Sequence, residues 1–173
     1  MILSVFLVLC VFSLFVSSAA HKLFGFSTFA RQVADYQLVP PVLATPGAVI
    51  VLALELTCIL LLVIMPVYGV ATAAGLLLLY ATAMGSNLVR GRTHIDCGCF
   101  ARPQATGFIS WAMVARNTMM AVICGVASIA APIDWAVAAG FGWFDWVGLA
   151  SALVAGIFLY QSGDQLLALE HKA

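Results

Sequence analysis

The chain has 173 residues, of which 64% are hydrophobic and 8% are charged, and its seven basic and seven acidic residues cancel to a net charge of zero. Soluble domains carry about 25% charged residues and need a wetted exterior, so this composition excludes a soluble globular domain. It indicates an integral membrane protein, and because the sequence has no basic stripe or nucleic-acid motif, no nucleic-acid partner is expected.

Five apolar runs follow one another along the chain, and each is close to the roughly 20 residues that a helix needs to cross a membrane. They cover residues 2–20, 44–65, 67–84, 111–131 and 143–160. The short alternating segments of a membrane β-barrel are not seen in the sequence. We therefore predict an all-α membrane bundle with four to five spanning helices, forming one domain over residues 1–173.

The first run ends in Ser18-Ala19-Ala20, a small-residue sequence of the kind that signal peptidase cleaves. No Lys or Arg precedes the apolar run, so the basic region of a signal peptide is missing. We expect residues 1–20 to form a retained membrane helix, with a cleaved leader as the alternative.

Residues 21–41 connect the first two runs and interleave aromatic with polar side chains. Arg31 and Asp35 are four positions apart, which is a pairing distance on a helix. The pattern predicts a short amphipathic helix in the membrane interface, ended by Pro40-Pro41. This helix serves either as an anchor or as a docking surface over the cysteine loop described below.

Glu55 interrupts the second run at a depth of about 11 residues, or roughly 16 Å at 1.5 Å per residue. An ionisable group there is costly, so it is either functional or part of a buried pair that holds the bundle together. Arg116, in the fourth run, is expected to reach toward Glu55 or to extend to the membrane surface. Asn117 and Asn87 are expected to form hydrogen bonds between helices.

The loop after the third run contains the sequence THIDCGCF at residues 93–100. Cys97 and Cys99 flank Gly98, and a disulfide between them is attainable but strained, because glycine tolerates unusual backbone dihedrals. A strained bridge is readily reduced, which is the property of an exchanging disulfide. The spacing therefore favours a redox-active pair.

Basic residues surround this pair. Arg90, Arg92 and His94 would lower the pKa of a neighbouring thiol, and Arg116 would attract its thiolate. Asp96 opposes this effect or accepts a proton. A basic and exposed setting is the one in which reactive cysteines occur.

Two other interpretations of the loop remain open from the residues alone. His94, Asp96, Cys97 and Cys99 are all zinc-ligand types, although they are more compressed than the usual two-pair spacing. The loop is otherwise an inert tight turn of small residues.

Cys58 and Cys124 lie at nearly equal predicted depth, each about 14 residues or roughly 21 Å from the face with the cysteine loop. If their helices touch, these residues form a second thiol pair that would pass electrons across the membrane. The alternative is that each is a small buried hydrophobic side chain.

Basic residues gather on one face of a five-helix topology. That face carries Lys22, Arg31, Arg90, Arg92, Arg102 and Lys172. The positive-inside rule places this face, and the cysteine loop with it, in the cytoplasm, although arginines recruited for chemistry would distort the count.

Four segments match the pattern of a known family. They are SAAHKLFGFSTFARQVADYQLVP after the first run, LALELTCILLL in the second, YATAMGSNLVRGRTHIDCGCF leaving the third and ISWAMVARN in the fourth. In these segments the chain resembles the MauE family of methylamine utilisation membrane proteins, within the wider MauE/DoxX redox-associated group. The match runs over nearly the whole chain, and it departs from the family at Ala101, where glycine is usual.

This resemblance implies a multi-pass protein of the bacterial inner membrane, needed to mature the methylamine dehydrogenase small subunit, which holds a tryptophan tryptophylquinone cofactor and many disulfides in the periplasm. It also implies a thioredoxin-like partner, MauD, and a thiol–disulfide oxidoreductase role with no further cofactor assigned; a quinone site is unsupported. A non-catalytic scaffold for the partner or the dehydrogenase subunit, and a metal-binding membrane protein, are the alternatives. A periplasmic partner conflicts with a cytoplasmic cysteine loop.

Overall fold

The structure is a computed structural model that describes the chain except residues 1, 94, 96–108, 131–139, 155 and 157–173. Its labelled elements are α1 (Ile2–Phe24), α2 (Phe26–Asp35), the short 3-10 helix η1 (Pro41–Leu43), α3 (Ala44–Ile64), α4 (Pro66–Val89) and α5 (Trp111–Ala130). The described part of the chain contains helices and connecting turns without strands. The predicted all-α class is confirmed.

Four helices in the described residues are long and apolar enough to cross a membrane. They span Leu3–Phe24, Pro41–Ile64, Pro66–Val89 and Trp111–Ile129. A shorter apolar helix, Trp143–Val154, corresponds to the fifth predicted run. Four of the predicted spans are therefore confirmed by length and composition, and a fifth spanning helix stays a prediction.

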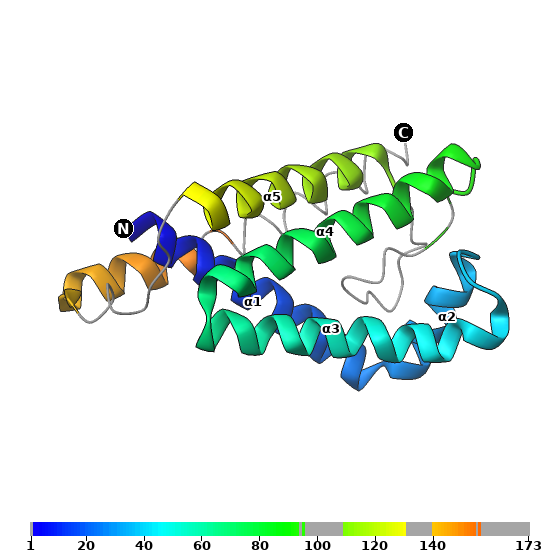
Figure 1. Ribbon diagram of the computed structural model, residues 1–173, viewed down its shortest axis with the longest axis horizontal. Coiled ribbons are helices and arrows are strands. Elements are labelled where there is room, and N and C mark those ends of the chain that lie inside the picture. The colour runs from blue at the N-terminus through cyan, green and yellow to red at the C-terminus, as the bar shows by residue number, and fades with distance from the viewer. Residues whose placement is uncertain (1, 94, 96–108, 131–139, 155, 157–173) are drawn as a thin grey trace.

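The long helices pack lengthwise into one bundle (Figure 1). α4 lies along α5 and also along α3, and α1 lies against α3. Their apolar faces meet in a core that takes Val8, Val11 and Phe15 from α1. Because these three side chains are buried against the other helices, α1 contributes to the core of the bundle.

The α3–α4 hairpin is tight because Pro66 begins α4 directly after Met65. A Cβ added at Gly69 would lie 2.4 Å from the backbone nitrogen of Leu62, so the two helices touch backbone to backbone here. The thiol of Cys58 donates a hydrogen bond to the Gly69 carbonyl oxygen at 3.5 Å. The close approach fixes the register of α3 against α4 and hence the relative positions of their polar residues.

α2 is the predicted amphipathic helix. It packs against α3 at the end of the bundle where α1 ends and α3 begins (Figure 1). The Phe29 side chain of α2 is buried, while the side chains of Arg31 and Asp35 are exposed. The predicted Arg31–Asp35 pair is wrong: the Arg31 guanidinium donates instead to the hydroxyl of Thr28 at 3.2 Å.

Candidate functional site

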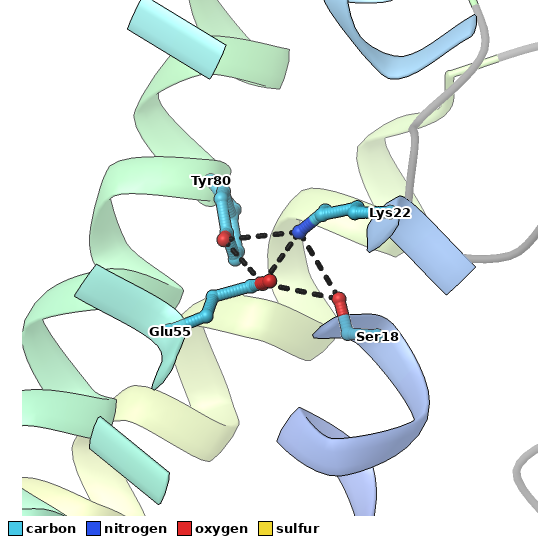
Figure 2. Close-up of polar contacts among 4 residues, drawn as sticks. All are labelled: Ser18, Lys22, Glu55 and Tyr80. Atoms are coloured by element: carbon cyan, nitrogen blue, oxygen red, sulfur yellow. Dashed lines mark hydrogen bonds and ion pairs between the residues drawn. The ribbon is translucent and has the colours of Figure 1, made fainter. Parts of the chain in front are cut away.

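A polar cluster is enclosed inside the bundle where α1, α3 and α4 meet (Figure 2). Glu55 of α3 and Lys22 of α1 form an ion pair, with 2.5 Å between Lys22 Nζ and Glu55 Oε1. Both side chains are buried, at 0% exposure for Glu55 and 2% for Lys22. In a low-dielectric interior, two opposite charges at this separation attract strongly, and each cancels the other's burial cost in part.

Two hydroxyl groups complete the cluster. Ser18 Oγ and Tyr80 Oη donate hydrogen bonds to Glu55 Oε1 at 3.0 and 2.6 Å. The same two oxygens accept hydrogen bonds from Lys22 Nζ at 3.1 and 3.2 Å. Each hydroxyl therefore bridges the cation and the anion, and the cluster ties three helices together.

Aromatic rings cover the ammonium group. Lys22 Nζ lies 5.0 Å from the ring centroid of Phe29 and 4.8 Å from that of Tyr80. Both distances fall within the range of cation–π attraction. Since Phe29 comes from α2, the amphipathic helix closes the cluster from the end of the bundle.

Glu55 keeps one acceptor unused. Its second oxygen, Oε2, is buried and accepts no hydrogen bond from the part of the chain that the structure describes. A buried acceptor left without a donor costs about 1–3 kcal/mol. Oε1 thus takes every hydrogen bond that the carboxylate receives from the described residues.

This arrangement corrects two sequence predictions. The proposed pairing of Arg116 with Glu55 is wrong, because the basic partner of Glu55 is Lys22. Lys22 was also counted among the basic residues of the cysteine-loop face, yet its charge is neutralised inside the bundle. It therefore drops out of the positive-inside count, which applies to charges in the loops.

The end of α4 is built to redirect the chain into the cysteine loop. Gly91 has a φ of +72°, a left-handed conformation that glycine adopts without a steric penalty. The backbone N–H groups of Gly91 and Arg92 donate to the carbonyl oxygens of Leu88 and Asn87, both at 2.9 Å. This pair of bonds is a Schellman motif, which ends the helix at a defined angle.

The loop that follows is closed at its base. The Ile109 N–H donates to the Thr93 carbonyl oxygen at 3.0 Å, which joins the chain leaving α4 to the chain entering α5. Ile95 and Ile109 are both buried. The five predicted site residues His94, Asp96, Cys97, Gly98 and Cys99 fall between the two ends and lie outside the described residues.

The arginines predicted to support the loop lie at this end of the bundle. Arg90 is exposed, and its guanidinium donates to the carbonyl oxygen of Gln37 in the turn after α2, at 3.5 Å. Arg92 donates to the side-chain oxygen of Asn87 at 3.4 Å. Arg116 is partly buried near the start of α5. Arg90 and Arg92 thus lie in the turn that leads from α4 into the loop.

The two asparagines behave differently from the prediction. Asn87 Nδ2 donates to the carbonyl oxygen of Ala83 in its own helix at 3.1 Å, and Asn87 Oδ1 accepts from Arg92. The expected bridge from Asn87 to another helix is therefore wrong. Asn117 is buried, and its Nδ2 donates no hydrogen bond to any group in the described ranges.

Cys58 and Cys124 both belong to the buried core, at 0% and 1% exposure. They and Cys10 are free thiols. The two buried residues thus lie in one cluster, and their pairing as a second redox couple stays a hypothesis. Groups of three or more potential metal ligands are not found among the described side chains, which do not include His94, Asp96, Cys97 and Cys99.

Three members of the polar cluster, Ser18, Lys22 and Tyr80, are not predicted from the sequence. In the sequence, Ser18 is part of a small-residue run, Lys22 resembles an interfacial charge, and Tyr80 has no distinguishing pattern. A usable signal was present: Ser18 and Lys22 are four residues apart, so they share one face of a continuous helix. That face points toward Glu55.

Comparisons with known proteins agree on one family. The family model described as "Methylamine utilisation protein MauE" matches residues 1–131. Methylamine utilization protein MauE of Methylophilus methylotrophus is 37% identical over 107 residues, covering 61% of this chain and 56% of that protein. The Paracoccus denitrificans protein is 35% identical over 112 residues, covering 64% of this chain and 60% of its own.

A MauE protein from Methylorubrum extorquens is 33% identical over 155 residues, or 84% of this chain and 80% of that protein. The matches to the Methylophilus and Paracoccus denitrificans proteins span 56% and 60% of the relatives' length. No solved structure matches the chain at a significant level.

Proposed function

The chain belongs to the MauE family of methylamine utilisation proteins, and we propose that it is a membrane thiol–disulfide redox protein whose exchanging pair is Cys97 and Cys99. Its partner in this proposal is a thioredoxin-like protein. The product is a correctly disulfide-bonded small subunit of methylamine dehydrogenase.

The closed base of the cysteine loop is the observation that carries the proposal. The Schellman motif at Gly91 and the bond between Thr93 and Ile109 fix the two ends of the segment that carries Cys97 and Cys99. The proposal requires that a soluble partner reach the cysteine pair from this end of the bundle. Fixed ends on the segment that carries the cysteine pair suit exchange with another protein, since the rate of exchange depends on access to the attacking thiol.

Charge at this end of the bundle supports the same chemistry. Arg90 is exposed and Arg92 is partly exposed, so both extend positive potential over the loop base. Positive neighbours stabilise a thiolate, which is the nucleophile in disulfide exchange. The arginines therefore act on the thiols through their field.

In the exchange step, the thiolate of one loop cysteine attacks a sulfur of the partner's disulfide. One partner S–S bond breaks as a mixed disulfide forms, and the freed partner thiolate takes up a proton. The second loop cysteine then loses its proton and attacks the mixed disulfide, which closes the Cys97–Cys99 bridge and releases the partner as a dithiol. Two electrons and two protons move to the partner in this direction. Net disulfide formation in the small subunit requires the reverse sequence, in which the Cys97–Cys99 bridge takes two electrons and two protons from the partner's dithiol.

Cysteine variants test this function. Cys97→Ser and Cys99→Ser should each abolish maturation of the dehydrogenase, measured as active enzyme in cells that express the variant as the sole copy. Cys10→Ser is the matched control, because Cys10 is a free thiol on α1 away from the loop, and it should retain maturation. Normal maturation with either loop variant would refute the redox role and favour a scaffold that only docks the partner.

The membrane side of the loop is tested separately. A membrane-impermeant thiol reagent, applied to intact cells after mild reduction, should label Cys97 and Cys99 if they serve a periplasmic partner. Failure to label them in cells, with labelling restored after lysis, would place the loop in the cytoplasm and exclude direct exchange with that partner.

A further inference from the structure

The polar cluster has the geometry of a binding site for a primary ammonium group. An R–NH₃⁺ group has three N–H donors and no acceptor. Lys22 Nζ directs these donors to three oxygens, one each on Ser18, Glu55 and Tyr80. Its hydrogen-bonding capacity is therefore fully used, and the single carboxylate balances its charge.

The aromatic rings of the site suit the carbon group that is attached to the ammonium nitrogen. The fourth substituent of Lys22 Nζ is a methylene group, and the rings of Phe29 and Tyr80 lie 5.0 and 4.8 Å from the nitrogen. Aromatic faces attract a cation and tolerate its alkyl part. The terminal –CH₂–NH₃⁺ of Lys22 is, chemically, a methylammonium ion on a tether.

Lys22 differs from the rest of the site in being able to leave it. It lies in the last turn of α1, so its long side chain can extend to the membrane surface. Glu55 lies inside α3 at 0% exposure and has no comparable route. When Lys22 is withdrawn, the buried carboxylate needs another cation or a proton.

We propose that Ser18, Glu55, Tyr80 and Phe29 form a binding site for a small primary alkylammonium ion, and that Lys22 is the tethered ammonium that fills it in the unliganded protein. The proposal rests on the family role in methylamine utilisation for its choice of amine, methylammonium. A rise in this ion displaces Lys22 toward the interface and changes what holds α1 and α2 to α3.

The geometry sets the selectivity. Methylammonium satisfies all three oxygens and places its methyl group where the lysine methylene lies. Tetramethylammonium has no N–H donor, and it leaves the buried carboxylate without the hydrogen bonds that it receives from Lys22. Potassium has neither donors nor an alkyl group. Affinity should therefore follow the number of N–H donors together with the presence of one small alkyl group.

Lys22→Ala removes the tethered competitor and is the direct test. The purified full-length variant in lipid nanodiscs should bind methylammonium chloride saturably, as a rise in Tm that potassium chloride and tetramethylammonium chloride at equal ionic strength do not produce. The wild-type protein should need a concentration higher by about tenfold or more, because a tethered group competes at an effective concentration in the millimolar range. The matched control is the double variant Lys22→Ala/Glu55→Gln, which should lose the response.

If methylammonium produces no specific rise in the Tm of folded Lys22→Ala, the proposal is overturned. If Lys22→Ala does not fold by itself, the same variant purified in methylammonium chloride should be recovered folded, and in potassium chloride it should not; equal recovery in both salts would also overturn it. Both readouts are independent of Cys97 and Cys99. Failure of this proposal therefore leaves the redox function standing, and failure of the redox function leaves this site intact.

Discussion

Replacing Lys22 with methionine removes the ammonium group from the polar cluster while it keeps an unbranched apolar side chain in place. The carboxylate of Glu55 then lies at 0% exposure with hydrogen bonds from Ser18 and Tyr80 as its remaining stabilisation. Breaking a buried ion pair by removing one partner costs about 3–5 kcal/mol. We expect Lys22→Met to lower the free energy of unfolding by an amount in this range.

Removing the carboxylate by Glu55→Gln should lower the free energy of unfolding by less, because Lys22 lies near the end of its helix whereas Glu55 lies inside its own. In Glu55→Gln the lysine is left without its anion, but it sits in the last turn of α1 and can extend to the interface. The cost is then closer to the roughly 1–3 kcal/mol of a disturbed buried hydrogen-bond group. In the double variant Lys22→Met/Glu55→Gln no buried charge remains, so much of the unfolding free energy that Lys22→Met loses should be recovered.

Equilibrium unfolding in mixed micelles with a denaturing detergent measures all four proteins of this cycle. The predicted order of stability is wild type, then Glu55→Gln, then Lys22→Met, with a favourable coupling energy between the two sites. A Glu55→Gln loss equal to or larger than that of Lys22→Met, or a double variant as unstable as the sum of the singles, would refute the buried pair as the basis of the cluster.

Two further outcomes test the packing of the bundle. Gly69→Ala should lower the free energy of unfolding by about 1–3 kcal/mol, because its Cβ would lie 2.4 Å from the Leu62 backbone nitrogen and overpack the hairpin. The control Gly75→Ala, whose Cβ would have nothing within 4 Å, should leave stability nearly unchanged. Equal losses of unfolding free energy in the two variants would disprove the tight hairpin. Cys58 and Cys124, at 0% and 1% exposure, should resist alkylation in the folded protein and react after unfolding, as read by mass spectrometry; rapid alkylation of the native protein would contradict their burial.

The long helices could be predicted because the membrane imposes a length and an apolar composition that the sequence displays directly. The helical pattern of α2 was equally readable, since Phe29 is buried and Arg31 is exposed. The specific Arg31–Asp35 pair failed because a surface ion pair gains little free energy, and a nearby hydroxyl on Thr28 competes for the guanidinium.

The polar cluster was only half predictable. Glu55 can be identified from the sequence because burying a carboxylate inside an apolar run costs free energy and therefore indicates a partner or a function. Arg116 is a candidate partner from the sequence because it also lies inside an apolar run, whereas Lys22 lies at the end of one, where a charge is ordinarily interfacial. The choice depends on how α1 packs against α3, a tertiary contact between residues 33 positions apart that no local pattern encodes.

The redox state of the cysteine loop in cells tests the central claim most directly. Cells are quenched with acid, free thiols are alkylated, and the fraction of the Cys97–Cys99 peptide that carries a disulfide is measured by mass spectrometry, with and without the thioredoxin-like partner. The account predicts a mixture of dithiol and disulfide whose ratio shifts when the partner is deleted. Two thiols that stay fully reduced, or a bridge that stays fully oxidised, under both conditions would contradict it.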